Sequence, residues 1–489
     1  MKESCLRGGP NESHWTRRPV LGWGIGILLW LAAWALLFSR TGPANLAGLI
    51  QGAAILLLGT ILSALILRVL DPAILTDNSR ILLLAMSCLL TLIPAGLLRY
   101  LSGQPHLIPE DILPSLMPFP LAPLLTGLLL GGPAAIVTGC WTSLASMVLL
   151  QSDITSLFAG FFAAVVVALL VPGVRRRTQI IRIGVIVSLC QSTVFLLEIK
   201  DFPPDWITMA RQVLFCVMGG TGAALVVVLL LPLFESLFGI TTNITLLELS
   251  DLGHPLLRRL AFEAPGTYHH SLMVANLAHA AADAIQANST LARVGAYFHD
   301  IGKMTKAKYF TENIQEAESP HDELAPSMSA LVVMGHVKEG LSLAMLHKLP
   351  GVVMEIIEQH HGTGLAAYFH HKAGQQALTA PRDAGNRGKN PTTVSTVDES
   401  PYRYPGPRPL SREAAIIMLA DALEATSRSM EKPTPGHITE LVDRLVDGRF
   451  EDGQFDECEM ELAELALVKK AFVACLTNML HTRITYPKT

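Results

Sequence analysis

The stretch Tyr297-Phe298-His299-Asp300-Ile301-Gly302-Lys303 lies in the polar second half of a 489-residue chain whose first half is strongly apolar. Its adjacent imidazole and carboxylate are side chains of the kind that hold hydrolytic metal ions. Further side chains of these two types occur in the same half: His270, His336, His360, His361 and Asp421. The seven side chains together predict a metal centre in that half.

Composition divides the chain into two parts and excludes several classes of protein. Half of the residues are hydrophobic, and charged residues are sparse before about residue 240 and frequent after it. A chain of this length is too long to fold around a single hydrophobic core, so we expect it to divide into parts. The net charge of -4 and the lack of a dense Lys/Arg block in the second half argue against duplex nucleic acid as a partner. The seven cysteines form no C-x-x-C pair, which predicts reduced thiols.

The first half contains apolar runs of membrane-spanning length. They lie at about 20–39, 45–70, 81–101, 113–131, 133–150, 155–172, 180–198 and 211–237. Each approaches the ~20 residues with which a helix crosses the hydrocarbon of a bilayer. We expect a cytosolic N-terminal tail at 1–19 and a transmembrane domain at 20–237 with about eight helices. Seven helices are also possible, because the fourth to sixth runs are short and interrupted by Gly and Pro.

Basic residues between the apolar runs predict the orientation of the chain. The strongest cluster, Arg175-Arg176-Arg177 with Arg182, belongs in the cytoplasm by the positive-inside rule. One further hairpin returns the chain to the cytoplasm near residue 238, so the second half is expected there, as part of a multi-pass protein of a bacterial inner membrane. Ionisable residues are nearly missing from the spans, which favours anchoring or sensing over transport. A cleaved signal peptide at 1–39 is disfavoured, because the apolar run is long and the next one follows closely.

The second half shows the pattern of amphipathic helices without alternating strands, and its candidate ligands continue the buried faces of these helices. Val353, Ile356 and Ile357 lead by steps of three and four to His360 and His361. Met418 leads in the same way to Asp421, and Arg428 follows two turns later on that face. A carboxylate on an apolar face needs a partner such as a metal ion. A single inward histidine is more often structural than a ligand, but seven inward polar groups in one helical domain favour metal binding.

Several motifs resemble the HD phosphohydrolase superfamily and, more closely, its membrane-bound 7TM-HD family of cyclic di-AMP phosphodiesterases. The motifs, in chain order, are Phe238-Gly-Ile-Thr-Thr, Leu246-Leu-Glu-Leu-Ser, Glu263-Ala-Pro-Gly-Thr-Tyr-His-His-Ser-Leu-Met-Val-Ala-Asn, Arg293-Val-Gly-Ala-Tyr-Phe-His-Asp-Ile-Gly-Lys, Gln359-His-His-Gly-Thr, Tyr404-Pro-Gly-Pro, Met418-Leu-Ala-Asp-Ala-Leu-Glu-Ala and Glu451-Asp-Gly-Gln-Phe-Asp-Glu-Cys. The resemblance covers nearly all of residues 238–487. It implies an all-α fold, in which a polytopic transmembrane helical bundle precedes a cytosolic all-helical HD domain at 238–489.

The sequence departs from typical relatives in two places. Those relatives carry a large extracytoplasmic domain after the first span, where only the five residues 40–44 stand here. The segment at about 372–397, rich in Gly, Ala, Thr, Asn and basic residues, resembles an insertion, and its composition predicts a mobile loop.

The resemblance implies a role for each site residue. Two divalent transition-metal ions are expected, with Mn or Fe favoured and Zn possible. His270, His299, Asp300 and Asp421 would hold one ion, and Asp300, His336, His360 and His361 would hold the other. Asp300 would thus bridge the ions and take part directly in catalysis. Lys303 is a catalytic and substrate-binding candidate that would neutralise a phosphate oxygen, although a solvated surface lysine is an equal alternative. Arg428 is a further substrate-binding candidate.

The activity implied by the resemblance is hydrolysis of cyclic di-AMP to the linear dinucleotide pApA. In two-metal hydrolysis the ions activate a shared water and stabilise the leaving oxygen. Two alternatives stay open: an HD hydrolase acting on another cyclic dinucleotide or a mononucleotide, and a non-catalytic nucleotide-binding membrane receptor. The expected partners are the cyclic dinucleotide and the lipid bilayer, and the sequence leaves homo-oligomer formation open.

Overall fold

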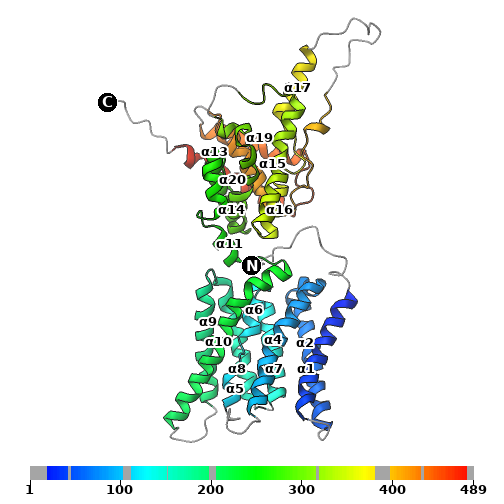
Figure 1. Ribbon diagram of the computed structural model, residues 1–489, viewed down its shortest axis with the longest axis vertical. Helices are drawn as coiled ribbons and strands as arrows, with labels where there is room; N and C mark the ends of the chain where they lie inside the picture. The colour runs from blue at the N-terminus through cyan, green and yellow to red at the C-terminus, as the bar shows by residue number, and fades with distance from the viewer. Residues whose placement is uncertain are drawn as a thin grey trace, which may run out of the picture. The chain divides into compact units, whose positions relative to one another are not determined.

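A computed structural model describes most of the chain (Figure 1). The described residues are 19–41, 46–102, 112–150, 152, 154–197, 205–314, 319–379, 397–430 and 434–481. They form two compact units that divide between Ile244 and Thr245. Across these ranges the regular structure is helical, and the β pairing is limited to one isolated bridge between Leu365 and Arg403. The expected all-α fold class is confirmed.

The first unit is a bundle of long apolar helices. Together with shorter helical segments, its described elements are α1 (Pro19–Thr41), α2 (Leu46–Leu70), α3 (Pro72–Thr76), α4 (Asn78–Ser102), α5 (Leu113–Leu116), α6 (Leu121–Leu130), α7 (Gly132–Leu150), α8 (Ile154–Leu170), the 3₁₀ turn η3 (Val171–Gly173), α9 (Arg177–Leu196) and α10 (Trp206–Phe238). In the described part of this unit, seven segments from α2 to α10 are long and apolar enough to cross a membrane. Helix α1 adds a shorter apolar stretch at Gly24–Ala33. These helices lie on the expected apolar runs.

Small residues let the helices of the first unit approach closely. A Cβ atom added to Gly139 of α7 would lie 2.3 Å from the Cβ of Ala164 of α8. A Cβ added to Gly184 of α9 would lie 2.6 Å from that of Ala224 of α10. In a bilayer, where lipid tails are as apolar as leucine, such close packing is a main source of helix association.

The run at 113–131 does not form one continuous helix. Helix α5 ends at Leu116, α6 begins at Leu121, and the residues between them, Met117 to Pro120, are buried. Pro118 and Pro120 lack the backbone N–H that would continue the helix, which explains the break. Within a membrane domain, non-helical backbone is tolerated where protein covers it, and residues 117–120 are covered in this way.

The second unit is a compact helical domain. Its elements are α11 (Asn243–Leu249), which begins at the border of the first unit, α12 (Pro255–Glu263), α13 (Pro265–Ala284), α14 (Ser289–Phe298), the 3₁₀ helices η4 (Ile301–Tyr309) and η5 (Thr311–Asn313), α15 (Pro326–Leu346), α16 (Gly351–Gln359), α17 (Ala367–Thr379), the 3₁₀ turn η6 (Ser400–Tyr402), α18 (Arg412–Ser427), α19 (Pro435–Glu451) and α20 (Leu462–His481). Helix α18 is buried along most of its length and packs on α13, α14, α16 and α19. It is the central helix of this unit.

Two segments of the second unit, α15 and α17, differ from what hydropathy or composition alone would suggest. Helix α15 is apolar enough to cross a membrane, but it packs against η4, α16 and α17 and therefore belongs to the helical domain. The expectation of a loop at 372–397 is wrong for residues 372–379, because α17 continues to Thr379 through Gln375-Gln376-Ala377-Leu378, whose residue types favour a helix. Residues 380–396 lie outside the described part, as do residues 1–18 of the expected tail. The six described cysteines are free thiols.

Candidate metal centre

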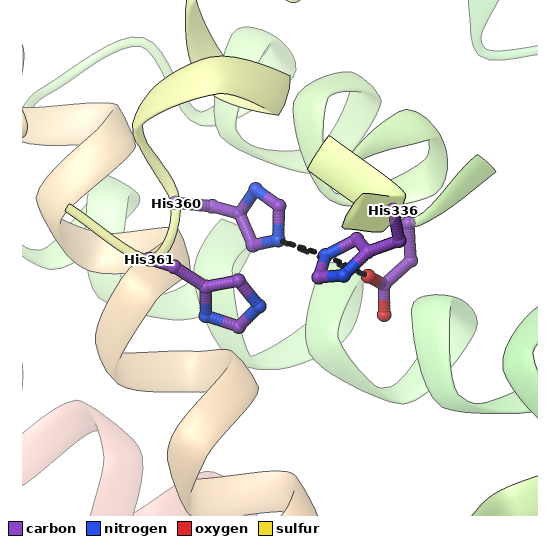
Figure 2. Close-up of side chains that lie close together, drawn as sticks. His336, His360 and His361 are labelled. Carbon is purple, nitrogen blue, oxygen red and sulfur yellow. Dashed lines mark hydrogen bonds and ion pairs between the residues drawn. The ribbon is translucent and has the colours of Figure 1, made fainter. Parts of the chain in front are cut away.

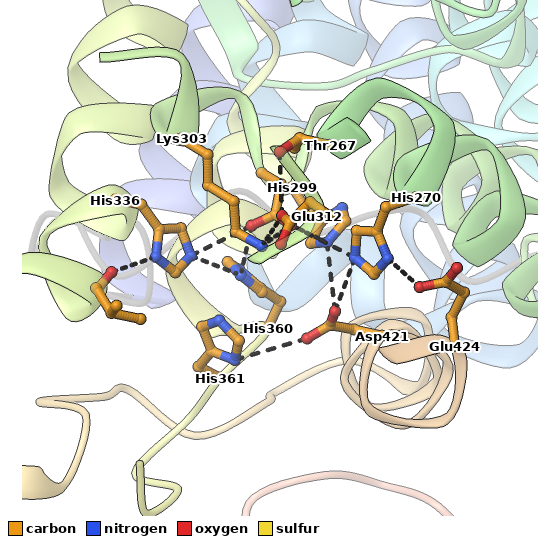
Figure 3. Close-up of polar contacts among 12 residues, drawn as sticks. Thr267, His270, His299, Lys303, Glu312, His336, His360, His361, Asp421 and Glu424 are labelled. Carbon is orange, nitrogen blue, oxygen red and sulfur yellow. Dashed lines mark hydrogen bonds and ion pairs between the residues drawn. The ribbon is translucent and has the colours of Figure 1, made fainter. Parts of the chain in front are cut away.

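The structure brings all seven predicted ligands together from five segments of the second unit. Figure 3 labels these side chains except that of Asp300. His270 lies in the first turns of α13, and His299 and Asp300 follow the end of α14. The remaining ligands come from α15, from the end of α16 and from the buried face of α18: His336, His360, His361 and Asp421. The inward faces that the sequence predicted for these helices therefore converge on one site.

The ligand atoms form two groups that share one carboxylate. His270, His299, Asp300 and Asp421 make one group, and Asp300, His336, His360 and His361 make the other. Within each group the ligand atoms lie within 4.8 Å of one another. We call these the His270 group and the His336 group. Their membership is the one that the family resemblance implied for two metal ions.

Asp300 turns one oxygen atom toward each group. Its Oδ2 lies 3.1 Å from Nε2 of His299 and 3.5 Å from Nε2 of His270. Its Oδ1 lies 3.3 Å from Nε2 of His336 and 3.8 Å from Nε2 of His360. A carboxylate placed in this way can bridge two ions.

Backbone carbonyls fix the orientation of three imidazoles. Nδ1 of His299, His336 and His360 lies 2.8, 2.6 and 2.8 Å from a carbonyl oxygen three residues earlier in the chain. Each Nδ1 therefore carries the proton and donates it, so that in the neutral ring the lone pair of Nε2 points into the site. Nε2 of His336 and Nε2 of His360 lie only 3.3 Å apart (Figure 2). Two facing lone pairs repel each other, and a cation bound to both would remove the repulsion.

Two further atoms of the site lack normal partners. Nε2 of His299 and Oδ1 of Asp300 are fully buried and make no hydrogen bond of normal geometry. Leaving such groups unsatisfied in the interior costs about 1–3 kcal/mol each. The donor set, its burial and these two atoms fit a bound divalent metal.

The electrostatics of the site favour ionised carboxylates. Burial would raise the pKa of Asp300, but the nearby His299 and Lys303 hold it well below its usual range. For Asp421, burial raises the pKa, while the hydrogen bond with His270 and the nearby His299 imidazole bring it well below the ordinary value. Both side chains can therefore offer full negative charge to an ion.

The two histidine groups differ in their tendency to hold a proton. Burial, together with neighbouring imidazoles, lowers the pKa of His360 to about 3 and that of His361 well below its ordinary value. For His299, burial is outweighed by Asp300 and Asp421, which raise the pKa to about 10. His360 and His361 are therefore neutral near pH 7 and ready to act as ligands, whereas His299 must release a proton when it binds a metal.

Lys303 and Arg428, the two predicted substrate contacts, lie at different depths. Nζ of Lys303 is nearly buried, 2.7 Å from Oδ2 of Asp300 and 2.9 Å from Oε1 of Glu312. Lys303 is therefore no solvated surface lysine. Arg428 has a more exposed side chain and pairs with Glu424, and its Nη2 lies 3.2 Å from Nδ1 of His270. Substrate binding by either residue stays a prediction.

Three residues of the site were missed by the sequence reasoning. Glu424 accepts the Nδ1 proton of His270, and Glu312 pairs with Lys303. The ring of Tyr404 lies 4.2 Å from that of His361, centroid to centroid. Glu424 follows Asp421 by three residues and so shares its helix face, which was a usable signal. Glu312 and Tyr404 lie in 3₁₀ and loop segments, where periodicity gives no such signal.

Comparison with known proteins places both halves of the chain. A family model described as "7TM receptor with intracellular HD hydrolase" matches residues 46–242, and a model for the HD domain matches residues 267–426. Together with the long apolar helices of the first unit, these matches identify a multi-pass membrane protein that carries an HD domain.

Curated relatives are similar over most of the chain. The Cyclic-di-AMP phosphodiesterase PgpH of Bacillus subtilis is 37% identical over 314 residues, which are 64% of this chain and 42% of that protein. The protein of the same name from Listeria monocytogenes is 36% identical over 377 residues, 76% of this chain and 50% of that protein. The chain thus spans about half the length of the curated relatives it matches.

One solved structure is similar to about half of the chain. It is the crystal structure of the L. monocytogenes PgpH HD domain in complex with cyclic-di-AMP, which is 42% identical in sequence. The match covers 48% of this chain and 100% of the crystallised chain, with a TM-score of 0.42. The family matches follow one another in the order of the two units, and the curated relatives span both. The chain therefore belongs to the family of 7TM membrane proteins with an intracellular HD hydrolase domain.

Proposed function

We propose that the chain is a membrane-anchored, metal-dependent phosphodiesterase that hydrolyses a cyclic dinucleotide. The observation that carries this proposal is the position of Asp300, whose two oxygens face two separate histidine groups. An HD phosphomonoesterase with a single ion needs only the His270 group. The presence of the His336 group is explained if it binds a second ion. A pair of ions suits the cleavage of a phosphodiester.

The substrate favoured by the comparisons is cyclic di-AMP, with the linear dinucleotide pApA as product. The relatives that span both units carry the name cyclic-di-AMP phosphodiesterase, and the similar HD domain was solved with that nucleotide. All seven ligands of the proposed centre are present in this chain and lie together. These facts support the same reaction here.

The side chains of the centre have distinct tasks in the proposed reaction. Bound divalent ions would supply Lewis acidity and an activated water. Asp300, ionised between the groups, would fix the spacing of the two positions. His299, His336 and His360 keep Nε2 pointed inward through their Nδ1 hydrogen bonds.

Lys303 would hold a positive charge beside the ligands and neutralise a phosphate oxygen of the substrate. Burial disfavours its charged form, but Asp300 and Glu312 outweigh this effect and raise the pKa above its usual value. Lys303 therefore stays charged at any pH at which the enzyme would work. Arg428, at the more exposed edge beside Glu424, is the proposed second contact to the substrate.

The donor set restricts the metal to a few candidates. Neutral imidazoles mixed with carboxylates, without a thiolate, suit Mn, Fe or Zn, and availability often decides among such ions. We propose two ions per chain, with Mn or Fe favoured.

For the membrane part we propose eight spans between about residues 20 and 237, with the HD domain from 238 onward on the cytoplasmic side of the inner membrane. Arg175 and Arg176 are exposed in the connection between η3 and α9, as cytoplasmic basic residues would be. A reporter fused after Met209 should then be active outside the cytoplasm and one after Phe238 inside. The reverse pattern would contradict this orientation.

The experiment that tests the function uses the full chain in nanodiscs, loaded with Mn or Fe. It is incubated with a panel of cyclic and linear nucleotides, and products are separated by chromatography. We expect metal-dependent conversion of cyclic di-AMP to pApA. Hydrolysis of another nucleotide in preference would change the substrate. Tight nucleotide binding without any hydrolysis by the metal-loaded protein would refute the enzyme and favour the receptor alternative.

A further inference from the structure

His361 is the ligand whose position depends least on its own helix. Helix α16 ends at Gln359, so His361 lies beyond the last helical residue. Its side chain is 19% exposed, more than that of any other of the seven ligands. Among the described contacts, no backbone carbonyl fixes its ring, and its Nδ1 lies 3.8 Å from Oδ2 of Asp421. Something outside α16 must therefore hold this residue in place.

The residue two positions later is held by distant parts of the chain. The backbone N–H of Thr363 donates to Oε1 of Gln454 at 3.0 Å, and the Thr363 hydroxyl accepts from Nε2 of Gln454 at 3.0 Å. The carbonyl oxygen of Thr363 accepts from Nη1 of Arg403 at 3.1 Å. All three polar groups of Thr363 are thus bonded to residues that lie 40 and 91 positions later in the chain.

Gln454 and Arg403 are themselves connected through Asp452. Nε2 of Gln454 donates to Oδ2 of Asp452 at 2.8 Å, and Nη2 of Arg403 lies 3.1 Å from Oδ1 of the same carboxylate. The side-chain amide of Gln454 is completely buried. Its orientation is fixed, because a backbone N–H can only be met by the amide oxygen and a carboxylate only by the amide nitrogen. We call Thr363, Arg403, Asp452 and Gln454 the brace.

The turn of residues 362 to 364, which follows His361, lies close against the Gln454 side chain. Gly362 has a φ of +53°, and a Cβ added to it would lie 2.4 Å from Oε1 of Gln454. Only glycine allows this backbone to approach the amide so closely. On the other side, the N–H of Tyr404 donates to the carbonyl oxygen of Gly364 at 3.0 Å. The turn from 362 to 364 is therefore held from both directions.

We propose that Gln454 is a positioning residue of the metal centre: through Thr363 it holds the turn after α16 and thereby keeps His361 in the His336 group. It does not contact the reacting atoms. The inference rests on the proposed two-ion centre, because the His336 group matters only if it binds an ion. It also assigns a role to the Glu451-Asp-Gly-Gln-Phe-Asp motif, which the ligand set leaves unexplained.

The test replaces Gln454 by methionine, an unbranched side chain of similar length that can neither donate nor accept the two bonds to Thr363. Outer-shell changes at metal sites typically lower metal affinity 10–100-fold. We expect Gln454→Met to weaken the ion of the His336 group by about this factor, while the ion of the His270 group stays. Titration of the full chain with Mn, with metal content by mass spectrometry and electron paramagnetic resonance of the coupled Mn pair, measures both ions.

Thr363 offers an independent second test that leaves the backbone bonds in place. Thr363→Val removes the hydroxyl but keeps the shape, and Thr363→Ser keeps the hydroxyl. Loss of the coupled Mn signal in the valine variant and its return in the serine variant are expected. The matched control is Asp456→Asn, because the exposed Asp456 lies in the same turn as Gln454 but pairs with Arg408 at 3.0 Å. It should bind two ions with affinities within about twofold of the original chain.

The outcomes separate this inference from the proposed function. If the original chain binds fewer than two ions, the proposed centre fails, whatever the variants do. If the original chain binds two ions and Gln454→Met and Thr363→Val bind both with unchanged affinity, the positioning role is refuted. Equal loss of both ions in a variant that remains folded by circular dichroism would also refute it, because the brace is predicted to act on one group.

Discussion

Glu424 gives the sharpest test of the His270 group. Its carboxylate accepts the Nδ1 proton of His270 and also pairs with Arg428. The change Glu424→Gln keeps the shape and one acceptor oxygen but removes the charge. A hydrogen bond to a charged group contributes about 1.5–3 kcal/mol and a neutral one about 0.5–1.5 kcal/mol. The difference, on the order of 1–1.5 kcal/mol, corresponds to roughly tenfold weaker binding of one ion.

Metal titration followed by mass spectrometry is the assay for this variant. We expect the ion of the His270 group to be lost at about tenfold higher metal concentration, while the His336 group keeps its ion. The matched control is Glu263→Gln, which removes the same charge from an exposed pair with Arg259 and should leave both ions unchanged. Unchanged affinity at both positions in Glu424→Gln would refute the view that this carboxylate supports His270.

Three other changes have expected outcomes. Asp300→Ala removes one ligand from each group, so it should abolish hydrolysis and lower the content of both ions while the helical content by circular dichroism is kept; normal turnover would be incompatible with the mechanism. Gly302→Ala would place a Cβ 1.9 Å from the carbonyl oxygen of His336, so we expect a loss of at least about 1–3 kcal/mol in denaturant unfolding and weaker metal binding; an unchanged variant would contradict the close packing of η4 on α15. Burial, followed by the charge of Glu358, raises the pKa of Glu355 to about 7, so stability should fall as pH rises from about 4.5 to 7. That pH dependence of the unfolding free energy should be on the order of 1 kcal/mol, because solvent screens a half-buried group. Glu355→Gln should remove it, and identical pH profiles of thermal unfolding in the variant and the original chain would contradict the prediction.

Periodicity made several ligands predictable because they continue a buried helix face, while others lie at helix ends. Asp421 follows Met418 on α18, and His360 follows Ile356 and Ile357 on α16, so the direction of each side chain could be inferred before its neighbours were known. Apolar length likewise located the helices of the first unit. Both signals are local in the sequence, which is why they were available.

Contacts between distant segments could not be predicted in this way. The pairing of Glu312 with Lys303 depends on the irregular path through η4 and η5, and the bonds of Gln454 to Thr363 join residues 91 positions apart. The break between α5 and α6 had a visible cause in Pro118 and Pro120, but an apolar run alone indicates length and not continuity. The role of Gln454 likewise depends on packing that no periodic pattern encodes.

The central claim is that Asp300 bridges two metal ions held by the seven ligands. Anomalous diffraction from crystals of the Mn-loaded protein, collected at the Mn edge, tests it most directly. We predict two peaks in the second unit, one within coordination distance of His270, His299 and Asp421 and the other within coordination distance of His336, His360 and His361, with one oxygen of Asp300 on each. A single peak, or two peaks that do not both contact Asp300, in crystals of protein shown to be active would contradict the account.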